Sequence, residues 1–318
     1  MLLSRVAESV YWAGRYLERA ETTARLVKTH TELYLALPLS VGLGWSPLLA
    51  VTGSDEAYRD QYTGAREDDI VTFLLADHDH PGSVVASIAQ ARHNLKVTRA
   101  ILPRRTWEVV NEAHMWSNDT CDKGVSRRAR LDWTEEVIRR CHLISGSMAA
   151  TMCRDDAYSF LEVGRFVERA DMTTRVLDVQ AGILMSDRTD RIEPYADLTW
   201  MAVLRSLGAE QMFRRSFGGA VDGGEAVRFL LRDPSFPRSV EHCLIEVSRW
   251  LLELPHQEEA MAGCAAVQRR LDELGTTESF DADALHQFVD RLQEGLGSLH
   301  ASLSDTYFLN ASTLAGTG

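Results

Sequence analysis

The sequence has little that would mark a disulfide-bonded, metal-binding or membrane-spanning protein. Its 318 residues include only 5 cysteines, and no Cys-x-x-Cys pair is present, which argues against a zinc site or a thioredoxin-type motif. Scattered cysteines are typical of a reducing compartment. No run approaches the roughly 18 apolar residues of a membrane span, and the first residues do not resemble a signal peptide. We therefore expect a soluble, cytoplasmic protein.

Basic residues and catalytic motifs are also scarce. The 34 Lys and Arg residues are outnumbered by 46 Asp and Glu, which gives a net charge of −12. Proteins that bind nucleic acid usually carry a basic surface, so no nucleic-acid partner is expected. The sequence contains neither a G-x-x-x-x-G-K-S/T phosphate loop nor a G-x-S-x-G nucleophile elbow. We expect no cofactor in this chain, and no catalytic residue can be named.

Strand patterns are nearly absent, and helical periodicity takes their place. In the first helix, apolar residues follow alternating steps of four and three from Val6 to Val27, which forms one continuous apolar seam. We predict an all-α bundle of about a dozen helices, forming a single domain over residues 1–318. The expected helices cover residues 4–36, 45–62, 67–76, 82–102, 103–117, 126–153, 155–186, 196–214, 223–232, 237–254, 257–274 and 281–310.

One charged segment occurs twice in the chain. GRYLERAETTARL, which begins at Gly14, reappears 150 positions later as GRFVERADMTTRVL, which begins at Gly164. Two further blocks repeat in the same order: WSPLLAVTGSDEAYR with WMAVLRSLGAEQMFR, and FLLADHDHPGSV with FLLRDPSFPRSV. We infer an internal duplication, with repeats at about 1–150 and 151–312, and we expect two related halves around a pseudo-two-fold axis.

The repeated segment carries the residues of our candidate site. On a helical wheel its charges lie opposite the apolar seam, so the simplest interpretation is a solvated face with local Arg15–Glu18 and Glu21–Arg25 pairs. Large apolar residues on the same face, and identical chemistry in both copies, favour burial instead. Buried charges must be paired, so they either lock the halves together or line a cavity for an anionic or zwitterionic ligand. The candidates are Arg15, Glu18, Arg19, Arg25, Arg165, Glu168, Arg169 and Arg175.

The sequence resembles the Alpha-E proteins, which are bacterial helical proteins named for a Glu–Arg motif. The resemblance rests on SRVAESVYWAGRYLERAETTARL at the start, DDAYSFLEVGRFVERADMTTRVLDV at 155–179 and LHQFVDRLQEGLGSLHASLSDTYF at 285–308. WEVVN and FLLRDPSFPRSV add to it, so that it spans nearly the whole chain. One block departs: the family usually shows Ala-Arg-Glu-Asn-Ala-Arg where residues 91–96 read ARHNLK, so that His93 replaces the glutamate.

The resemblance implies an all-helical fold and a partnership with a circularly permuted ATP-grasp protein of the amide-ligase type. A transglutaminase-like protein is a possible further partner, and ATP and Mg²⁺ would belong to the ATP-grasp partner. The chain is then expected to be an accessory subunit that binds the ligase, or its anionic or amine substrate, through the duplicated Arg–Glu motifs. Two alternatives stay open: an enzyme that uses Glu18 and Glu168 as acid and base, and a purely structural scaffold.

Two smaller groups of polar and aromatic residues have features of a binding site or a metal site. Arg92 matches the family pattern, and Trp107 and Asn111 lie one helical turn apart, so all three are candidates for the rim of a site. The run ADHDHPGS at 76–83 could ligate a metal, but its counterpart RDPSFPRS keeps only Asp233. A loop that leads into a helix fits both copies, so we predict no metal site.

Overall fold

The computed structural model describes residues 3–185, 193–219, 221–274 and 282–308. Throughout these residues the regular structure is helical, with fourteen α-helices, three short 3₁₀-helices and no strand. The all-α prediction is thereby confirmed. No helix in the same ranges is long and apolar enough to cross a membrane.

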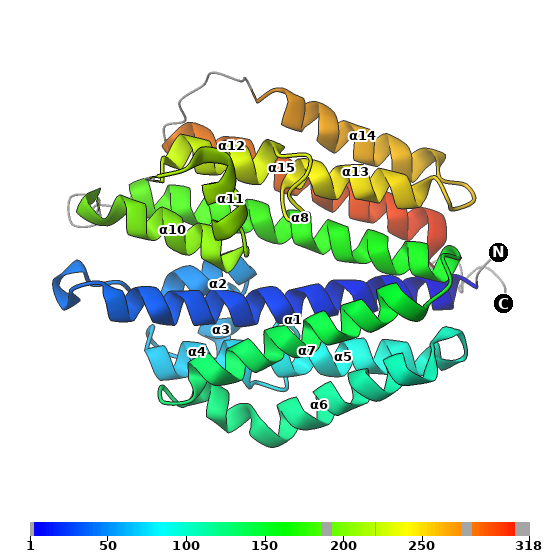
Figure 1. The fold of residues 1–318 in the computed structure, drawn as a ribbon, viewed down its shortest axis with the longest axis horizontal. Helices are drawn as coiled ribbons and strands as arrows, with labels where there is room; N and C mark the ends of the chain where they lie inside the picture. Colours follow the sequence, from blue (N-terminus) through cyan, green and yellow to red (C-terminus); the bar gives the residue numbers. More distant parts are fainter. Residues whose placement is uncertain (1–2, 186–192, 220, 275–281, 309–318) are drawn as a thin grey trace.

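Two long helices, α1 (Ser4–Ala36) and α8 (Asp156–Met185), lie side by side through the centre of the molecule (Figure 1). α1 buries side chains on nearly all of its faces, including the charged face, because neighbours surround it. The other α-helices are α2 (Ser46–Thr52), α3 (Asp55–Gln61), α4 (Glu67–Leu75), α5 (Val84–Val97), α6 (Arg104–Val125), α7 (Arg130–Thr151), α10 (Ala196–Ser206), α11 (Glu210–Phe217), α12 (Gly223–Arg232), α13 (Val240–Leu251), α14 (Glu258–Asp272) and α15 (Ala282–Tyr307).

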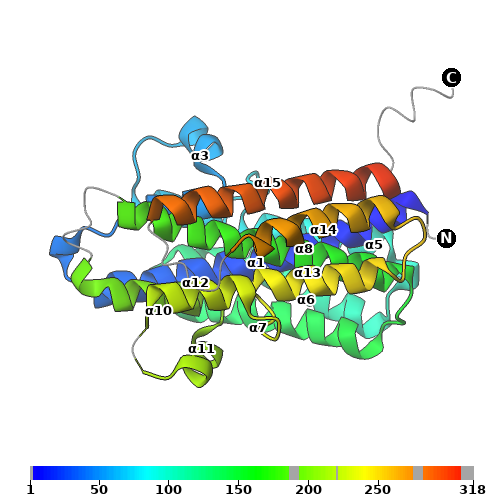
Figure 2. The same cartoon turned by 90° about the horizontal axis from the view of Figure 1, so that it is seen from above.

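The helices of the two halves pack in a matching order. α5 and α7 pack on α1, and α6 packs on both α5 and α7; α13 and α15 pack on α8, and α14 packs on both of them. The short helices cross over, so that α2 lies on α8 and α10 lies on α1. Figure 2 shows α3 and α11, which follow these helices, projecting from opposite edges of the bundle. Each of these helices in the first half thus has a counterpart in the second, and the internal repeat itself stays a prediction.

Two of the expected helices are each interrupted by a glycine. The segments 45–62 and 196–214 were predicted as continuous helices, and this prediction is wrong. Gly53 ends α2 with a φ of 63°, and Gly208, at the equivalent place after α10, has a φ of 65°. A left-handed residue stops a helix, and glycine adopts that conformation without the steric cost of a Cβ.

The other expected helices are found with small shifts of their boundaries. The first helix and the helix at 223–232 have the predicted ends, whereas α6 continues to Val125 instead of ending at 117. The expected helix at 82–102 gives way after Val97 to a 3₁₀-helix. Positions 186 and 309–310, which we placed at helix ends, and the expected end of the second repeat at 312 lie outside the described residues.

Two glycines allow α1 and α8 to touch at their backbones. A Cβ added to Gly14 would lie 2.3 Å from the carbonyl oxygen of Leu161, and one added to Gly164 would lie 2.1 Å from that of Tyr11. Neither distance leaves room for a side chain. The two contacts are reciprocal, because Leu161 stands 150 positions after Tyr11, as Gly164 does after Gly14. This close crossing brings the charged residues of one repeated segment against those of the other.

The loops before α5 and α13 have the same pattern of hydrogen bonds. Asp77 Oδ1 accepts bonds from the backbone N–H groups of the second and third residues after it, and Asp233 Oδ1 does the same in the other half. Ser83 and Ser239 then cap α5 and α13, each accepting a backbone N–H at 3.1 Å. The aspartates of both loops are therefore used to shape the turn.

Candidate functional site

The two Glu–Arg dipeptides of the repeated segments bind each other across α1 and α8. Glu168 accepts two bonds from Arg19, Nε to Oε1 at 2.6 Å and Nη2 to Oε2 at 3.1 Å. Glu18 accepts two bonds from Arg169, Nη2 to Oε2 at 2.7 Å and Nε to Oε1 at 3.1 Å. Arg15 adds a third bond to Glu168, with 2.6 Å between Nε and Oε2. The interpretation of a solvated face with an Arg15–Glu18 pair is therefore wrong, because the helix crossing supplies a partner from the other half.

Both central carboxylates are buried and ionised. Glu18 is 2% exposed and Glu168 is 1% exposed. Burial acts to raise the pKa of Glu168, but Arg15 and Arg19 outweigh it and lower this pKa to about 2. Burial likewise acts against ionisation of Glu18, and Arg169 and Arg238 outweigh it, so the Glu18 pKa is also lowered. The two glutamates carry full negative charge at neutral pH.

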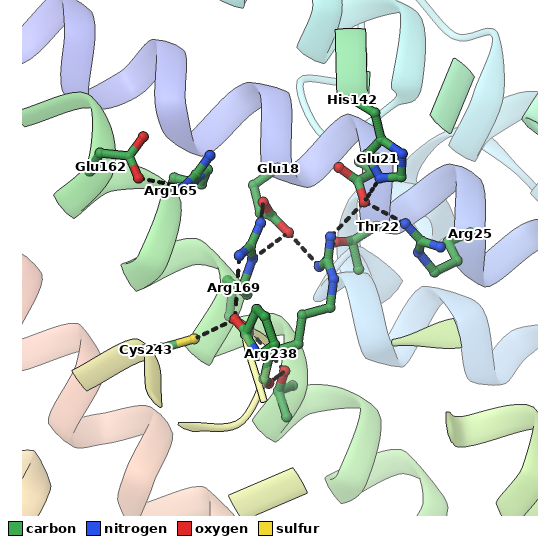
Figure 3. A network of polar contacts seen from close by, with 12 residues as sticks. Glu18, Glu21, Thr22, Arg25, His142, Glu162, Arg165, Arg169, Arg238 and Cys243 are labelled. Atoms are coloured by element: carbon green, nitrogen blue, oxygen red, sulfur yellow. Dashed lines mark hydrogen bonds and ion pairs between the residues drawn. The ribbon is translucent and has the colours of Figure 1, made fainter. Parts of the chain in front are cut away.

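One arginine of this site comes from outside the repeated segments. Arg238, in the loop before α13, contacts Glu18 through Nη1 and Glu21 through Nη2, the latter at 2.5 Å (Figure 3). Arg238 is 8% exposed. The sequence analysis missed Arg238, although a signal was present. The aligned blocks FLLADHDHPGSV and FLLRDPSFPRSV place Arg238 opposite Gly82, so only the second half carries an arginine at this position.

Glu21 brings together nitrogen-bearing side chains from three parts of the chain. Besides Arg238 it contacts Arg25, one turn along α1, and His142 of α7, whose Nε2 lies 3.1 Å from Oε1 (Figure 3). Burial acts to raise the pKa of Glu21, but Arg238, His142 and Arg25 together lower it. The predicted Glu21–Arg25 pair is thus present, within a larger cluster.

Arg165 is a predicted site residue that does not bind the central glutamates. It pairs with Glu162, one turn earlier on α8 (Figure 3). The position equivalent to Glu162 in the first half is Trp12, and the Arg15 guanidinium lies over that ring at 5.3 Å from its centroid. Because the second half has a glutamate where the first half has a tryptophan, Arg165 pairs with Glu162 and not with Glu18. Arg238 is the second arginine, beside Arg169, that contacts Glu18.

Arg175 lies beside a cavity at the other end of the site. Its Nε donates to Asp171 Oδ2 at 3.0 Å, and a terminal nitrogen lies against Gly53. The cavity has a volume of about 330 Å³ and is lined by residues that include Arg19, Thr23, His80, Gly82, Glu168, Asp171 and Arg175.

These contacts make up one Arg–Glu network with two ends. We call the part around Glu18 and Glu21 the closed end; it also contains Arg25, Arg169 and Arg238. The part around Glu168 and Asp171 is the open end, because the cavity lies there; it also contains Arg15, Arg19 and Arg175.

The three rim candidates form a separate cluster between α5 and α6. Arg92 Nε donates to Asn111 Oδ1 at 2.8 Å, and its guanidinium lies 5.5 Å from the Trp107 ring centroid. The shared face of Trp107 and Asn111 was expected, and Arg92 joins them, but no ion pair or hydrogen bond among the described residues links the three to the Arg–Glu network.

Comparison with known proteins gives this arrangement a family. A family described as "a predicted alpha-helical domain with a conserved ER motif" matches residues 2–308. The chain belongs to the Alpha-E family. In this Alpha-E chain the two Glu–Arg dipeptides join α1 to α8, since each glutamate binds the arginine of the other copy in the pairs Glu18–Arg169 and Glu168–Arg19.

Similar proteins come from mycobacteria. They belong to Mycobacterium bovis and to two strains of Mycobacterium tuberculosis, and all are described as uncharacterized. Each is 27% identical to this Alpha-E chain over an alignment of 343 positions, gaps included, which covers 99% of the chain. The match covers 37% of each relative, so the chain spans little more than a third of their length. A search of the solved structures found no match.

Proposed function

We propose that this Alpha-E chain is a non-catalytic, cytoplasmic partner of an ATP-grasp amide or peptide ligase. It binds the ligase or a substrate of the ligase, and the bond-forming chemistry takes place on the partner, which supplies ATP and Mg²⁺. The observation that carries the proposal is the complete pairing of both central glutamates with arginines of the opposite half.

That pairing disfavours the alternative of an enzyme that uses Glu18 and Glu168 as acid and base. A general acid or base works best with a pKa near the operating pH. The pKa of Glu168 is about 2, and that of Glu18 is lowered as well, so neither carboxylate takes up a proton near neutral pH. Burial raises the pKa of Glu162, but this carboxylate is 3% exposed and pairs with Arg165.

Two observations support a partnership. The resemblance to Alpha-E proteins implies a circularly permuted ATP-grasp protein working beside this chain, with a transglutaminase-like protein as a second candidate partner. In the mycobacterial relatives, more than half of each protein lies outside the match, which leaves room for further domains in the same polypeptide.

The scaffold alternative keeps one observation in its favour. The network sits where Gly14 and Gly164 bring α1 and α8 together, so it also fixes how the halves are placed. A scaffold alone would contribute to stability without any effect on a ligase.

The test combines this chain with a circularly permuted ATP-grasp protein of the same organism. We expect the two to elute together in size-exclusion chromatography, and we expect ATP-dependent amide formation to require both. Each protein alone, at the same concentration, is the control. An unchanged rate of amide formation when this chain is omitted would refute the partnership, and product formation by this chain without the ligase would revive the enzyme alternative.

A further inference from the structure

The cavity at the open end occupies the place that Arg238 fills at the closed end. Arg238 corresponds in the repeat to Gly82, which lines the cavity. At the closed end Arg238 reaches Glu18, Glu21 and Thr22. The three residues 150 positions later all line the cavity: Glu168, Asp171 and Met172.

A second exchange within the same loop makes the cavity wall more polar. In the second half, Phe236 stacks on Phe229 with 4.9 Å between ring centroids. At the equivalent position in the first half, His80 stacks on Phe73 at 4.0 Å. His80 thus keeps the packing of an aromatic ring and adds a buried nitrogen, Nε2, which has no hydrogen-bond partner among the described residues.

Other hydrogen-bonding groups around the cavity also lack partners. Thr23 is 1% exposed, and its hydroxyl has no partner in the described part of the chain, whereas the hydroxyl of its counterpart Thr173 donates to the Arg238 carbonyl at 2.8 Å. Within that same part of the chain, Arg175 donates hydrogen bonds only through Nε, and Arg19 only through Nε and Nη2. Unsatisfied buried groups such as the Thr23 hydroxyl are costly, whereas the side chains of Arg19 and Arg175 are 25% and 32% exposed. A bound polar group would satisfy the hydroxyl and face the free arginine nitrogens.

The charge balance of the open end decides which kind of group fits. At the closed end, a guanidinium fills the place that corresponds to this cavity, which would suggest a cation as the ligand. However, Glu168 already pairs with Arg15 and Arg19, and Asp171 pairs with Arg175. Three arginines against two carboxylates leave one positive charge in excess, so a further cation would be repelled and one anionic group would neutralise the site.

We propose that the cavity at the open end binds a carboxylate, carried by a small molecule or by the end of a peptide. Arg19 and Arg175 hold the carboxylate, and Thr23 and His80 contribute hydrogen bonds from the wall. A volume of about 330 Å³ suits a small ligand, and Ala57 and Met172 offer apolar contact to its hydrocarbon part. The inference deepens the proposed function, since amide ligases join carboxylates to amines; it rests on that function only for the role of the ligand as a substrate.

The first part of the test measures binding by the isolated chain. N-acetyl-dialanine, which ends in a carboxylate, and its carboxamide counterpart are titrated separately into the protein and followed by NMR chemical shifts. We expect saturable binding of the carboxylate and binding of the carboxamide that is about tenfold weaker or less, because charge-assisted hydrogen bonds are lost.

Three variants assign that binding to the cavity. H80F/G82R rebuilds the closed end at the open end; both positions change because a Cβ on Gly82 would lie 2.7 Å from His80 Nε2. R175Q removes one donor without filling the space. Both variants are expected to bind the carboxylate about tenfold more weakly. R140Q is the matched control, because it removes an i,i+4 pair with Glu136 on α7, outside the Arg–Glu network, and it should bind like the wild type.

Several results would overturn the carboxylate site. They are equal binding of the carboxylate and the carboxamide, equal loss in R140Q and R175Q, preferential binding of inorganic phosphate or of guanidinium ion, and the absence of any binding. Ligase association is measured separately with the same proteins. Carboxylate binding without ligase association would keep the proposed binding site and refute the proposed function. Ligase association without carboxylate binding would refute the binding site alone.

Discussion

The two ends of the Arg–Glu network have the same charge balance but different shapes. At the closed end, three arginines face two glutamates, and one of the three, Arg238, arrives from a loop. At the open end, three arginines face Glu168 and Asp171, and the loop position that would supply an arginine is Gly82. The comparison teaches that a duplicated helical segment can keep its ion pairs while a two-residue difference in a loop decides whether an arginine or a cavity lies beside the two carboxylates.

The largest expected effect comes from removing a central carboxylate. E18Q leaves Arg169 buried without its counter-charge and leaves Arg238 with Glu21 alone, so we expect the free energy of unfolding to fall by about 3–5 kcal/mol. E168Q should cost less, because the side chain of Arg19 is 25% exposed beside the cavity and can be hydrated there. Urea unfolding followed by circular dichroism measures both values. Equal losses would contradict the difference in hydration between the two ends.

Acid should weaken both ends through the same carboxylates. The pKa of Glu168 is about 2 in the folded chain, below the unfolded value of about 4.3, and the pKa values of Glu18 and Glu21 are lowered too. Because the unfolded chain binds these protons more readily, the stabilisation is fully present above about pH 5 and is lost as the pH falls towards about 2.

For Glu168 alone this contribution is on the order of 3 kcal/mol. Thermal unfolding midpoints between about pH 6 and pH 2 measure it. E168Q should lose less stability over that range than the wild type, and identical acid dependence of the two proteins would show that the Glu168 pairs do not contribute in the folded state.

A smaller effect, equal on both helices, is expected at the helix crossing. G14A and G164A each force a Cβ against a backbone oxygen, at 2.3 Å and 2.1 Å, so we expect each to lower the free energy of unfolding by about 1–3 kcal/mol. G146A is the control: this exposed glycine of α7 has open space around it, and alanine should stabilise the helix by about 1 kcal/mol. A large loss at only one of the two crossing positions would mean that the contacts are not equivalent.

Much of the fold could be predicted from local patterns. The first helix was predicted with both of its ends, because its apolar seam is continuous and Pro38 follows its last turn. The breaks at Gly53 and Gly208 were missed, since a single glycine inside a periodic segment does not reveal whether its φ is positive.

The candidate site was only partly predictable. Identity between the two copies pointed to the repeated charges, and most of them meet in one network. The sequence did not reveal that Glu162 removes Arg165 from the network or that Arg238 takes its place. Both changes depend on which side chains come within hydrogen-bond distance, and local spacing carries no such information for residues of different helices.

The sequence by itself determined that the chain is helical, that one charged segment is present twice, and that these charges share a face with large apolar residues. Only the tertiary structure decided that Glu18 pairs with Arg169 instead of its neighbour Arg15, that the carboxylates stay ionised when buried, and that a cavity remains beside Gly82. The physical reason is that ion pairing and pKa depend on distance and solvent exclusion, and both are set where two glycines let α1 and α8 cross at backbone contact.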